Sequence, residues 1–137
     1  MGYGHLYQGR FKSFPVQNDR QFLIVARHVE RNALRAGLVE RAERWKWSSL
    51  WRRAHPAADV KQAVVLSDWP VPRPADWVRW VNEPQTAAEV ERLRRCIAKG
   101  QPFGDDRWEA RTVKRLALQS SLRDRGRPKK AAGKAKP

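Results

Sequence analysis

The chain has 137 residues, a length typical of one domain, with 29 lysines and arginines against 14 aspartates and glutamates and a formal net charge of +15. No apolar run approaches the roughly 20 residues of a membrane span, no signal peptide is recognisable at the first residues, and the single cysteine excludes an internal disulfide and a cysteine-based zinc site. We therefore expect a soluble, cytoplasmic protein with no membrane partner.

The first predicted element is a short strand at residues 10–17, where polar and apolar side chains alternate. Both faces of this segment have large apolar groups, which is typical of a strand that packs against a core. Pro15 has no backbone N–H group, so we expect the strand to lie at a sheet edge or to end there.

A helix is predicted at residues 20–36. Asn18 and Asp19 provide its N-cap, and Gly37 is expected to end it in the position after the C-cap. Apolar side chains recur with helical spacing and predict the buried stripe of this helix: Phe22, Val25, Ala26, Val29 and Ala33.

A tryptophan-rich segment follows at residues 44–51. Ser48 and Ser49 are expected to cap one short helix, with Trp47 before the cap and Trp51 in the first turn. Three tryptophans within seven residues, interleaved with basic residues, suit two roles. They can pin a loop to a small core, which we favour, or they can stack on nucleic-acid bases.

The second half of the chain is predicted to be helical. It begins with a loop at residues 54–63 and an extended spacer at residues 69–74, which contains three prolines. Helices are expected at residues 76–82, at residues 86–99 between a Thr86 cap and Gly100, and at residues 104–118, with a further turn at residues 120–122. The stripe predicted for the helix at residues 76–82 is Trp77, Trp80 and Val81. For residues 86–99 it is Ala87, Val90, Leu93, Arg94 and Ile97, and for residues 104–118 it is Trp108, Thr112, Arg115 and Leu116.

The C-terminal tail, residues 119–137, has seven basic residues and one acidic residue and too few apolar residues to pack, so we expect it to be disordered. The rest of the chain still has 22 basic and 13 acidic residues. We divide the chain into a first region at residues 1–53, the loop and spacer at 54–74, a helical region at 75–118 and the tail. A positive surplus of this size attracts nucleic acid.

The residues alone contain no self-sufficient active site. The three histidines, His5, His28 and His55, lack metal-ligand spacing, and zincin, P-loop and GxSxG patterns are absent. The nearest candidate is one face of the helix at residues 20–36, formed by Ile24, His28, Arg31, Asn32 and Arg35. Polar residues opposite a core stripe are also the ordinary solvated arrangement of a helix.

Several ordered blocks of sequence add a resemblance. They are residues 4–13 (GHLYQGRFKS), 27–39 (RHVERNALRAGLV), 45–50 (WKWSSL), 101–105 (QPFGD) and 125–130 (RGRPKK). From residue 4 onward the chain resembles the C-terminal part of REP-associated tyrosine transposases, members of the single-tyrosine HUH transposase superfamily.

The resemblance implies an α+β, ferredoxin-like domain that binds single-stranded or hairpin DNA. In complete relatives, a His-hydrophobe-His pair holds a divalent metal, Mg or Mn, which polarises the scissile phosphate. A tyrosine then attacks the phosphate and becomes covalently joined to it. An amide one helical turn after the tyrosine, at the position of Asn32, completes the metal's ligand set.

The chain departs from this pattern in two ways. The His-hydrophobe-His pair is expected upstream of residues 4–13, and the chain begins only three residues before that block. In addition, this chain has His28 at the position where the relatives have the nucleophilic tyrosine. The only tyrosines, Tyr3 and Tyr7, are poor substitutes for the nucleophile. Tyr7 matches a position that relatives usually fill with an aromatic residue, whose role is packing. We therefore expect no catalytic residue and no cofactor in this chain.

The tail contains the core of an AT-hook, Arg125-Gly126-Arg127-Pro128. Such a segment lies in the narrow minor groove of A·T-rich DNA, where glycine allows close approach and arginines follow the negative potential. The residues expected to contact DNA are Arg10, Lys12, Arg31, Arg35, Arg125, Gly126, Arg127, Pro128, Lys129 and Lys130.

For the fold, we expect a mainly α-helical chain with at most one or two short strands, derived from an α+β family. For the function, we expect a DNA-binding protein related to transposases that cut and rejoin single-stranded or hairpin DNA, inactive in catalysis and associated with the nucleoid. The alternative is a stand-alone nucleic-acid-binding module or regulator. The tail adds A·T-rich duplex DNA as a partner, and a homodimer is a further alternative.

Overall fold

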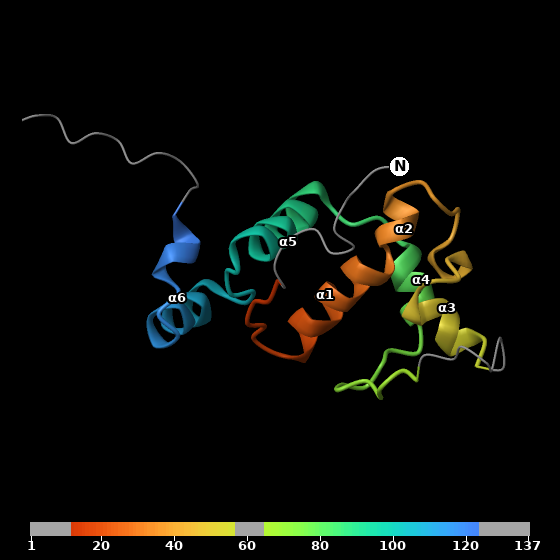
Figure 1. Ribbon diagram of the computed structural model, residues 1–137, viewed down its shortest axis with the longest axis horizontal. Coiled ribbons are helices and arrows are strands. Elements are labelled where there is room, and N and C mark those ends of the chain that lie inside the picture. The colour runs from red at the N-terminus through yellow and green to blue at the C-terminus, as the bar shows by residue number, and fades with distance from the viewer. Residues whose placement is uncertain (1–11, 57–64, 124–137) are drawn as a thin grey trace, which may run out of the picture.

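The computed structural model describes residues 12–56 and 65–123, and the described part is mainly helical, as predicted (Figure 1). Its α-helices are α1 (Asp19–Glu30), α2 (Asn32–Arg35), α3 (Ser49–Ala54), α4 (Trp77–Asn82), α5 (Ala87–Lys99) and α6 (Asp106–Arg115). The described residues also form two 3₁₀ helices, η1 (Ala42–Arg44) and η3 (Gln119–Leu122). The second confirms the turn expected at residues 120–122.

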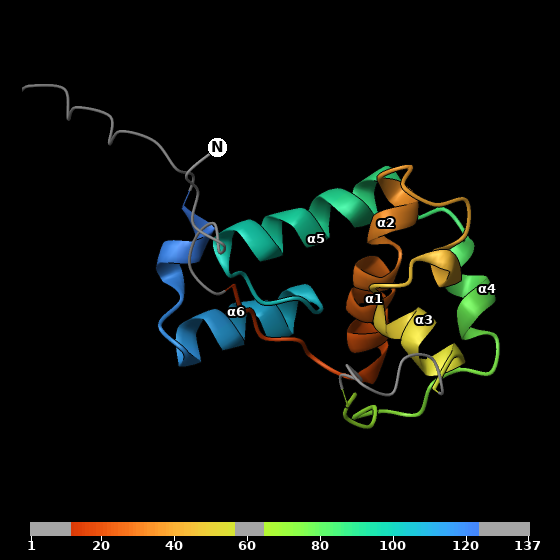
Figure 2. The same cartoon turned by 45° about the vertical axis from the view of Figure 1, so that its right-hand side comes forward.

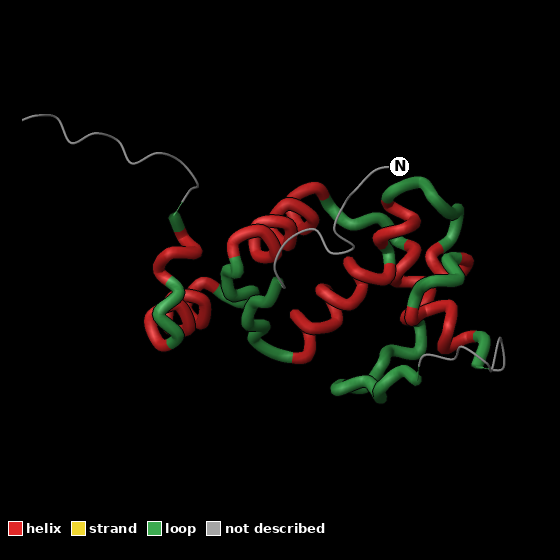
Figure 3. The backbone as a smooth tube through the Cα atoms, in the orientation of Figure 1, coloured by secondary structure: helices red, strands yellow, loops and turns green. Residues whose placement is uncertain are grey.

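Of the strand predicted at residues 10–17, residues 10 and 11 lie outside the described residues, and residues 12–17 form only one parallel bridge, between Val16 and Phe103. The backbone of Phe103 donates to Pro15 O at 2.9 Å and accepts from Gln17 N at 3.1 Å. This bridge cannot extend into a strand pair. Pro15 has no N–H group to donate, and the chain after Phe103 turns into α6, whose N-cap is Asp105. Across the described residues the tube is helix and loop without a strand (Figure 3).

Helix ends follow the capping signals of the sequence. Side-chain oxygens of Asn18, Ser48, Thr86 and Asp105 accept hydrogen bonds from first-turn backbone N–H groups of α1, α3, α5 and α6. At the C-terminal end of α2, Gly37 has a φ of 70°. Its N–H bonds Leu34 O, and the N–H of Leu38 bonds Ala33 O, both at 3.0 Å, which is a Schellman motif.

The continuous helix predicted at residues 20–36 is divided into α1 and α2 at Arg31. Arg31 keeps a 2.9 Å hydrogen bond from its N–H to Arg27 O, but its ψ of −6° departs from helical values near −42°. The predicted end of α6 near residue 118 is also corrected. Helix α6 ends at Arg115 because Ala117 adopts a left-handed φ of 52°.

Helix α1 lies between two hydrophobic clusters, with α3 and α4 on one side and α5 and α6 on the other (Figure 2). The first cluster contains Ala42, Leu50, Trp77 and Val81, with Leu23, Ala26, Leu34, Trp69 and Trp80 packed against it. The second contains Leu93, Cys96 and Phe103, with Phe14, Val16, Ile24 and Val25. One helix therefore holds both clusters together.

Trp69 in the proline-rich spacer makes edge-to-face contacts with Trp77, at 4.9 Å between ring centroids, and with Phe22 at 6.0 Å. Such aromatic pairs contribute beyond the area that they bury. The spacer is therefore attached to the first cluster. In the described residues, no helix has the length and apolarity that a membrane crossing requires.

The predicted stripe of α1 is wrong at Val29, which is 62 % exposed. Arg27, His28 and Glu30 are buried instead. In α6, Thr112 is buried as predicted, but Arg115 and Leu116 are exposed, and the buried neighbour is Val113. Helical spacing identifies a face, whereas the polar partners supplied by α4 and by the α4–α5 turn decide which face of α1 is buried.

Candidate nucleic-acid interface

Two arginines of the α1–α2 segment bind the C-terminal carbonyl groups of α4. Arg27 donates from Nε to Trp80 O at 2.8 Å and from Nη2 to Glu83 O at 2.7 Å. Arg31 donates from Nη1 to Val81 O at 2.9 Å and to Asn82 O at 2.6 Å. Carbonyls at the end of a helix have no intrahelical partner, so these guanidinium groups cap α4 and hold it on α1.

His28, at the position of the transposase nucleophile, is 6 % exposed. Its Nδ1 lies 3.3 Å from Gln85 Oε1, and Arg35 Nη1 lies 3.1 Å from Nδ1 and 3.3 Å from Nε2. Arginine can only donate and Gln85 Oε1 can only accept, so both contacts are satisfied by a neutral ring with its proton on Nδ1, which donates to Gln85 and leaves Nε2 to accept from Arg35. Burial and the positive charges of Arg35 and Arg94 lower the pKa of His28 below its ordinary value, which favours the neutral ring at pH 7.

Arg35 lies at the exposed edge of this network. Its Nη2 donates to Asn32 Oδ1 at 2.6 Å, and its Nη1 faces His28. Desolvation and the nearby Arg94 lower the pKa of Arg35, although a guanidinium remains charged in proteins. Desolvation and the charges of Arg27 and Arg35 lower the pKa of Arg31 in the same way.

We call Arg27, Arg31, Arg35 and Arg94 the arginine cluster. Among the described residues, one carboxylate forms an ion pair with the cluster: Glu89 lies 3.7 Å from Arg27 and accepts from Gln85 Nε2 at 3.2 Å. Within the described ranges, neither Arg35 nor Arg94 forms an ion pair. The cluster is therefore under-neutralised, which is the electrostatic condition for binding a phosphate.

Arg94 was not among the predicted DNA contacts. Its helical spacing placed it in the buried stripe of the helix at residues 86–99, but the structure places it on the exposed side of α5, near His28 and Arg35. The charge of Arg94 could have indicated that it is exposed, since an arginine in a stripe of small and aliphatic residues rarely packs in a core.

Other predicted site residues lie apart from the arginine cluster. Lys12 is exposed before the Val16–Phe103 bridge. The residues Arg10, Arg125, Gly126, Arg127, Pro128, Lys129 and Lys130 lie outside the described residues.

Asn32, the predicted metal ligand, is exposed, and its Oδ1 faces a guanidinium. No group of three His, Cys, Asp or Glu side chains suited to a metal ion occurs in the described ranges. A cation next to Arg35 would be repelled, so Asn32 and its described neighbours do not fit a divalent metal.

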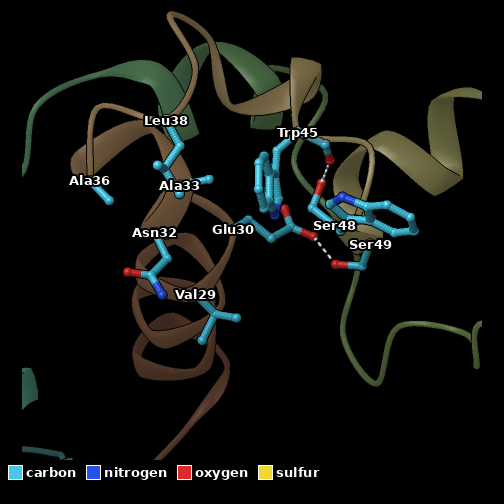
Figure 4. A pocket seen from close by; sticks show the side chains of 10 residues that line it. Val29, Glu30, Asn32, Ala33, Ala36, Leu38, Trp45, Ser48 and Ser49 are labelled. Carbon is cyan, nitrogen blue, oxygen red and sulfur yellow. Dashed lines mark hydrogen bonds between the residues drawn. The ribbon is translucent and has the colours of Figure 1, made fainter. Parts of the chain in front are cut away.

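A groove of about 330 Å³ opens beside α1 and α2 (Figure 4). In that view Val29, Asn32, Ala33 and Leu38 form one wall, with Trp45, Ser48 and Ser49 facing them and Glu30 between. We call this the tryptophan groove.

Trp47 also lines the tryptophan groove, and it is 74 % exposed, with Lys46 Nζ 4.9 Å from its ring centroid. The favoured interpretation, in which the tryptophans pin a loop to a core, is therefore wrong for Trp47. Trp51 by contrast stacks on His55 at 4.5 Å.

Comparisons with known proteins gave no match. No protein-family model, curated protein or solved structure matched this chain. The arginine cluster and the tryptophan groove are therefore the basis of the functional interpretation.

Proposed function

We propose that the protein binds DNA, with a backbone phosphate held at the arginine cluster. The observation that supports this most directly is the meeting of four guanidinium groups, of which only Arg27 forms an ion pair with a described residue, Glu89. Arg31, Arg35 and Arg94 form no ion pair in the described part, but Arg31 is bonded to the carbonyls of α4, so Arg35 and Arg94 are the groups available to a ligand. Arginine forms strong, bidentate hydrogen bonds with phosphate.

We further propose a relationship to REP-associated tyrosine transposases, which cut and rejoin single-stranded or hairpin DNA. Support comes from the ordered sequence blocks, the net charge of +15 and the position of Asn32 beside Arg35. On this proposal the described helices correspond to part of an α+β domain, and the chain binds DNA in the nucleoid.

Catalysis is not part of the proposal, because His28 is buried and both of its ring nitrogens face hydrogen-bonding partners. A nucleophile must reach the phosphorus atom with a free lone pair. The burial of His28 equally favours the second candidate, a stand-alone nucleic-acid-binding module that regulates without cutting.

The test is fluorescence anisotropy of a labelled DNA hairpin at several salt concentrations. Each lost phosphate contact reduces the magnitude of the slope of log affinity against log salt by roughly 0.7 to 0.9. The double variant Arg35→Gln, Arg94→Gln loses two contacts, so the magnitude of its slope should be smaller by about 1.4 to 1.8. Arg79→Gln is the matched control, since Arg79 is an exposed arginine on α4 that pairs with Asp76 and Glu83. Equal slopes for the double variant and the unmodified chain would overturn the proposal.

A further inference from the structure

The tryptophan groove continues along α1. Val29, Glu30 and Ser49 line it and also line an adjoining apolar groove that reaches Phe22 and Trp69. Two exposed apolar side chains, Val29 and Leu38, lie along the tryptophan groove. Apolar surface of this kind marks a binding site when polar groups converge on it.

Glu30 is the polar group at the centre of this groove, and it is 7 % exposed. Its Oε1 accepts from Ser49 Oγ at 2.7 Å, and its Oε2 accepts from Trp77 Nε1 at 2.6 Å. Both donors are neutral, and Glu30 forms no ion pair with any described residue. A carboxylate has about four acceptor positions, so roughly half of its capacity is unused.

A buried carboxylate without a counter-cation is costly, and further N–H donors reduce that cost. The donors must come from a neutral or weakly polar ligand. A cationic ligand is opposed by the net charge of +15 and by Lys46 at the groove. A second copy of the chain would bring the same positive charge onto this face.

We propose that the tryptophan groove binds an unpaired nucleobase of single-stranded DNA. The base stacks on Trp47, its exocyclic amino group donates to Glu30, and Lys46 contacts the adjacent phosphate. Tryptophan stacks on the face of any base, whereas a carboxylate accepts from the amino group of cytosine or adenine and finds no such group on thymine. This inference rests on the proposed DNA binding and names the form of DNA that the groove selects.

The experiment measures binding of the full chain to labelled oligo(dC), oligo(dA), oligo(dT) and a duplex by fluorescence anisotropy. We expect Trp47→Ala to weaken single-strand binding by about 5- to 100-fold, the range of single-base stacking, and to leave duplex binding unchanged. Trp47→Phe should restore most of the affinity, because phenylalanine retains an aromatic face. Leu116→Ala is the control and should bind like the unmodified chain, because Leu116 is an exposed apolar side chain at the C-cap of α6, a helix that lies across α1 from α3 and α4 (Figure 2).

Glu30→Gln tests recognition of the amino group. Because Glu30 also bonds Ser49 and Trp77, the variant is compared through the ratio of its affinities for oligo(dC) and oligo(dT), which any loss of folded protein affects equally. We expect the unmodified chain to prefer oligo(dC) and the variant to lose most of that preference.

The outcomes separate the two proposals. If the chain binds duplex and single strands and Trp47→Ala has full single-strand affinity, the groove proposal fails and DNA binding stands. If the unmodified chain binds oligo(dT) as well as oligo(dC), the role of Glu30 is wrong. If the chain binds none of these DNAs, the proposed function fails together with the groove.

Discussion

Trp77 Nε1 donates a 2.6 Å hydrogen bond to Glu30 Oε2, and this contact joins α4 to α1 across 47 residues of sequence. Trp77 is buried, and its ring meets Trp69 and Trp80 edge to face. The same residue thus supplies apolar packing and a donor to a buried carboxylate. Removal of the donor alone should therefore affect stability.

We expect Trp77→Phe to lower the free energy of unfolding by about 2 to 4 kcal/mol, because a hydrogen bond to a buried carboxylate is lost and the smaller ring leaves a cavity in the core. The measurement is urea denaturation followed by circular dichroism. Trp47→Phe, the same substitution at an exposed tryptophan, should change the free energy by less than about 0.5 kcal/mol. Equal effects at the two positions would show that neither the bond to Glu30 nor the packing of the larger ring at Trp77 contributes to stability.

Arg31 was predicted to contact DNA, and its hydrogen bonds to Val81 O and Asn82 O give it a structural role as well. Arg31→Gln should destabilise the protein by about 1 to 3 kcal/mol, since charged hydrogen bonds to the end of α4 are lost. Arg79→Gln should cost less than about 1 kcal/mol, as is usual for an exposed ion pair. Chemical denaturation of both variants measures the difference, and a smaller loss for Arg31→Gln would contradict the capping role.

The sequence predicted helix positions well, because caps are local. Asn18, Ser48, Thr86 and the positive φ of Gly100 mark ends that depend on neighbouring residues alone. The buried side of α1 was not predictable in the same way. Arg27 is buried because the carbonyls of α4, more than 50 residues away, accept its hydrogen bonds, and no local pattern contains that information.

The candidate site was predictable in part. The spacing of His28, Arg31 and Arg35 placed them on one face of a helix, and the structure joins His28 and Arg35 directly. Arg94 was missed because it comes from α5, and Glu30 because a lone acidic residue in a helix is usually solvated. Both become visible only when distant helices are packed together.

His28 should make stability depend on pH. Its pKa is lowered in the folded protein by burial and by Arg35 and Arg94, with Gln85 and Glu89 acting in the opposite direction. The unfolded chain therefore binds more protons than the folded chain below the ordinary pKa of 6.5, and stability is lost as the pH falls through that value. Urea midpoints at pH 7.5, 6.5 and 5.5 should decrease in that order.

His28→Gln should flatten this dependence between pH 5.5 and 7.5. The lowered pKa values of Glu43 and Asp105 act in a lower window, because stability from a depressed carboxyl pKa is lost only as the pH falls below ordinary values of 4.5 and 3.8. A midpoint that is constant down to pH 5.5 in the unmodified chain would show that His28 is not the titrating group.

Incubation with a single-stranded DNA hairpin and magnesium or manganese should give no covalent adduct, because His28 is buried between Gln85 and Arg35. His28→Tyr should also give none, since the side chain would start from the same buried position. The measurement is denaturing gel electrophoresis of labelled DNA. A protein–DNA band that survives denaturation, with either chain, would show that the protein cleaves DNA.

The basic tail should contribute most of the salt dependence of DNA binding. Deletion of residues 124–137 removes six basic residues and should flatten the slope of log affinity against log salt by up to about 5 units. The cut follows Arg123 because η3 belongs to the folded part, where Ser121 is buried and its carbonyl accepts from Gln101 Nε2 at 2.7 Å. Titrations of hairpin and duplex DNA at four salt concentrations measure the slope.

Point variants separate minor-groove contact from general attraction. If residues 125–128 lie in a minor groove, Arg127→Ala should weaken binding to A·T-rich duplex more than to G·C-rich duplex, because the narrow A·T groove has the stronger negative potential. Lys134→Ala should weaken both equally, as expected for a phosphate contact. If both variants weaken both duplexes alike, the tail binds phosphates without a base preference. If the chain without residues 124–137 keeps its full affinity and its full slope of log affinity against log salt, the DNA-binding surface lies wholly in the helices, where Arg35 and Arg94 are the groups to test.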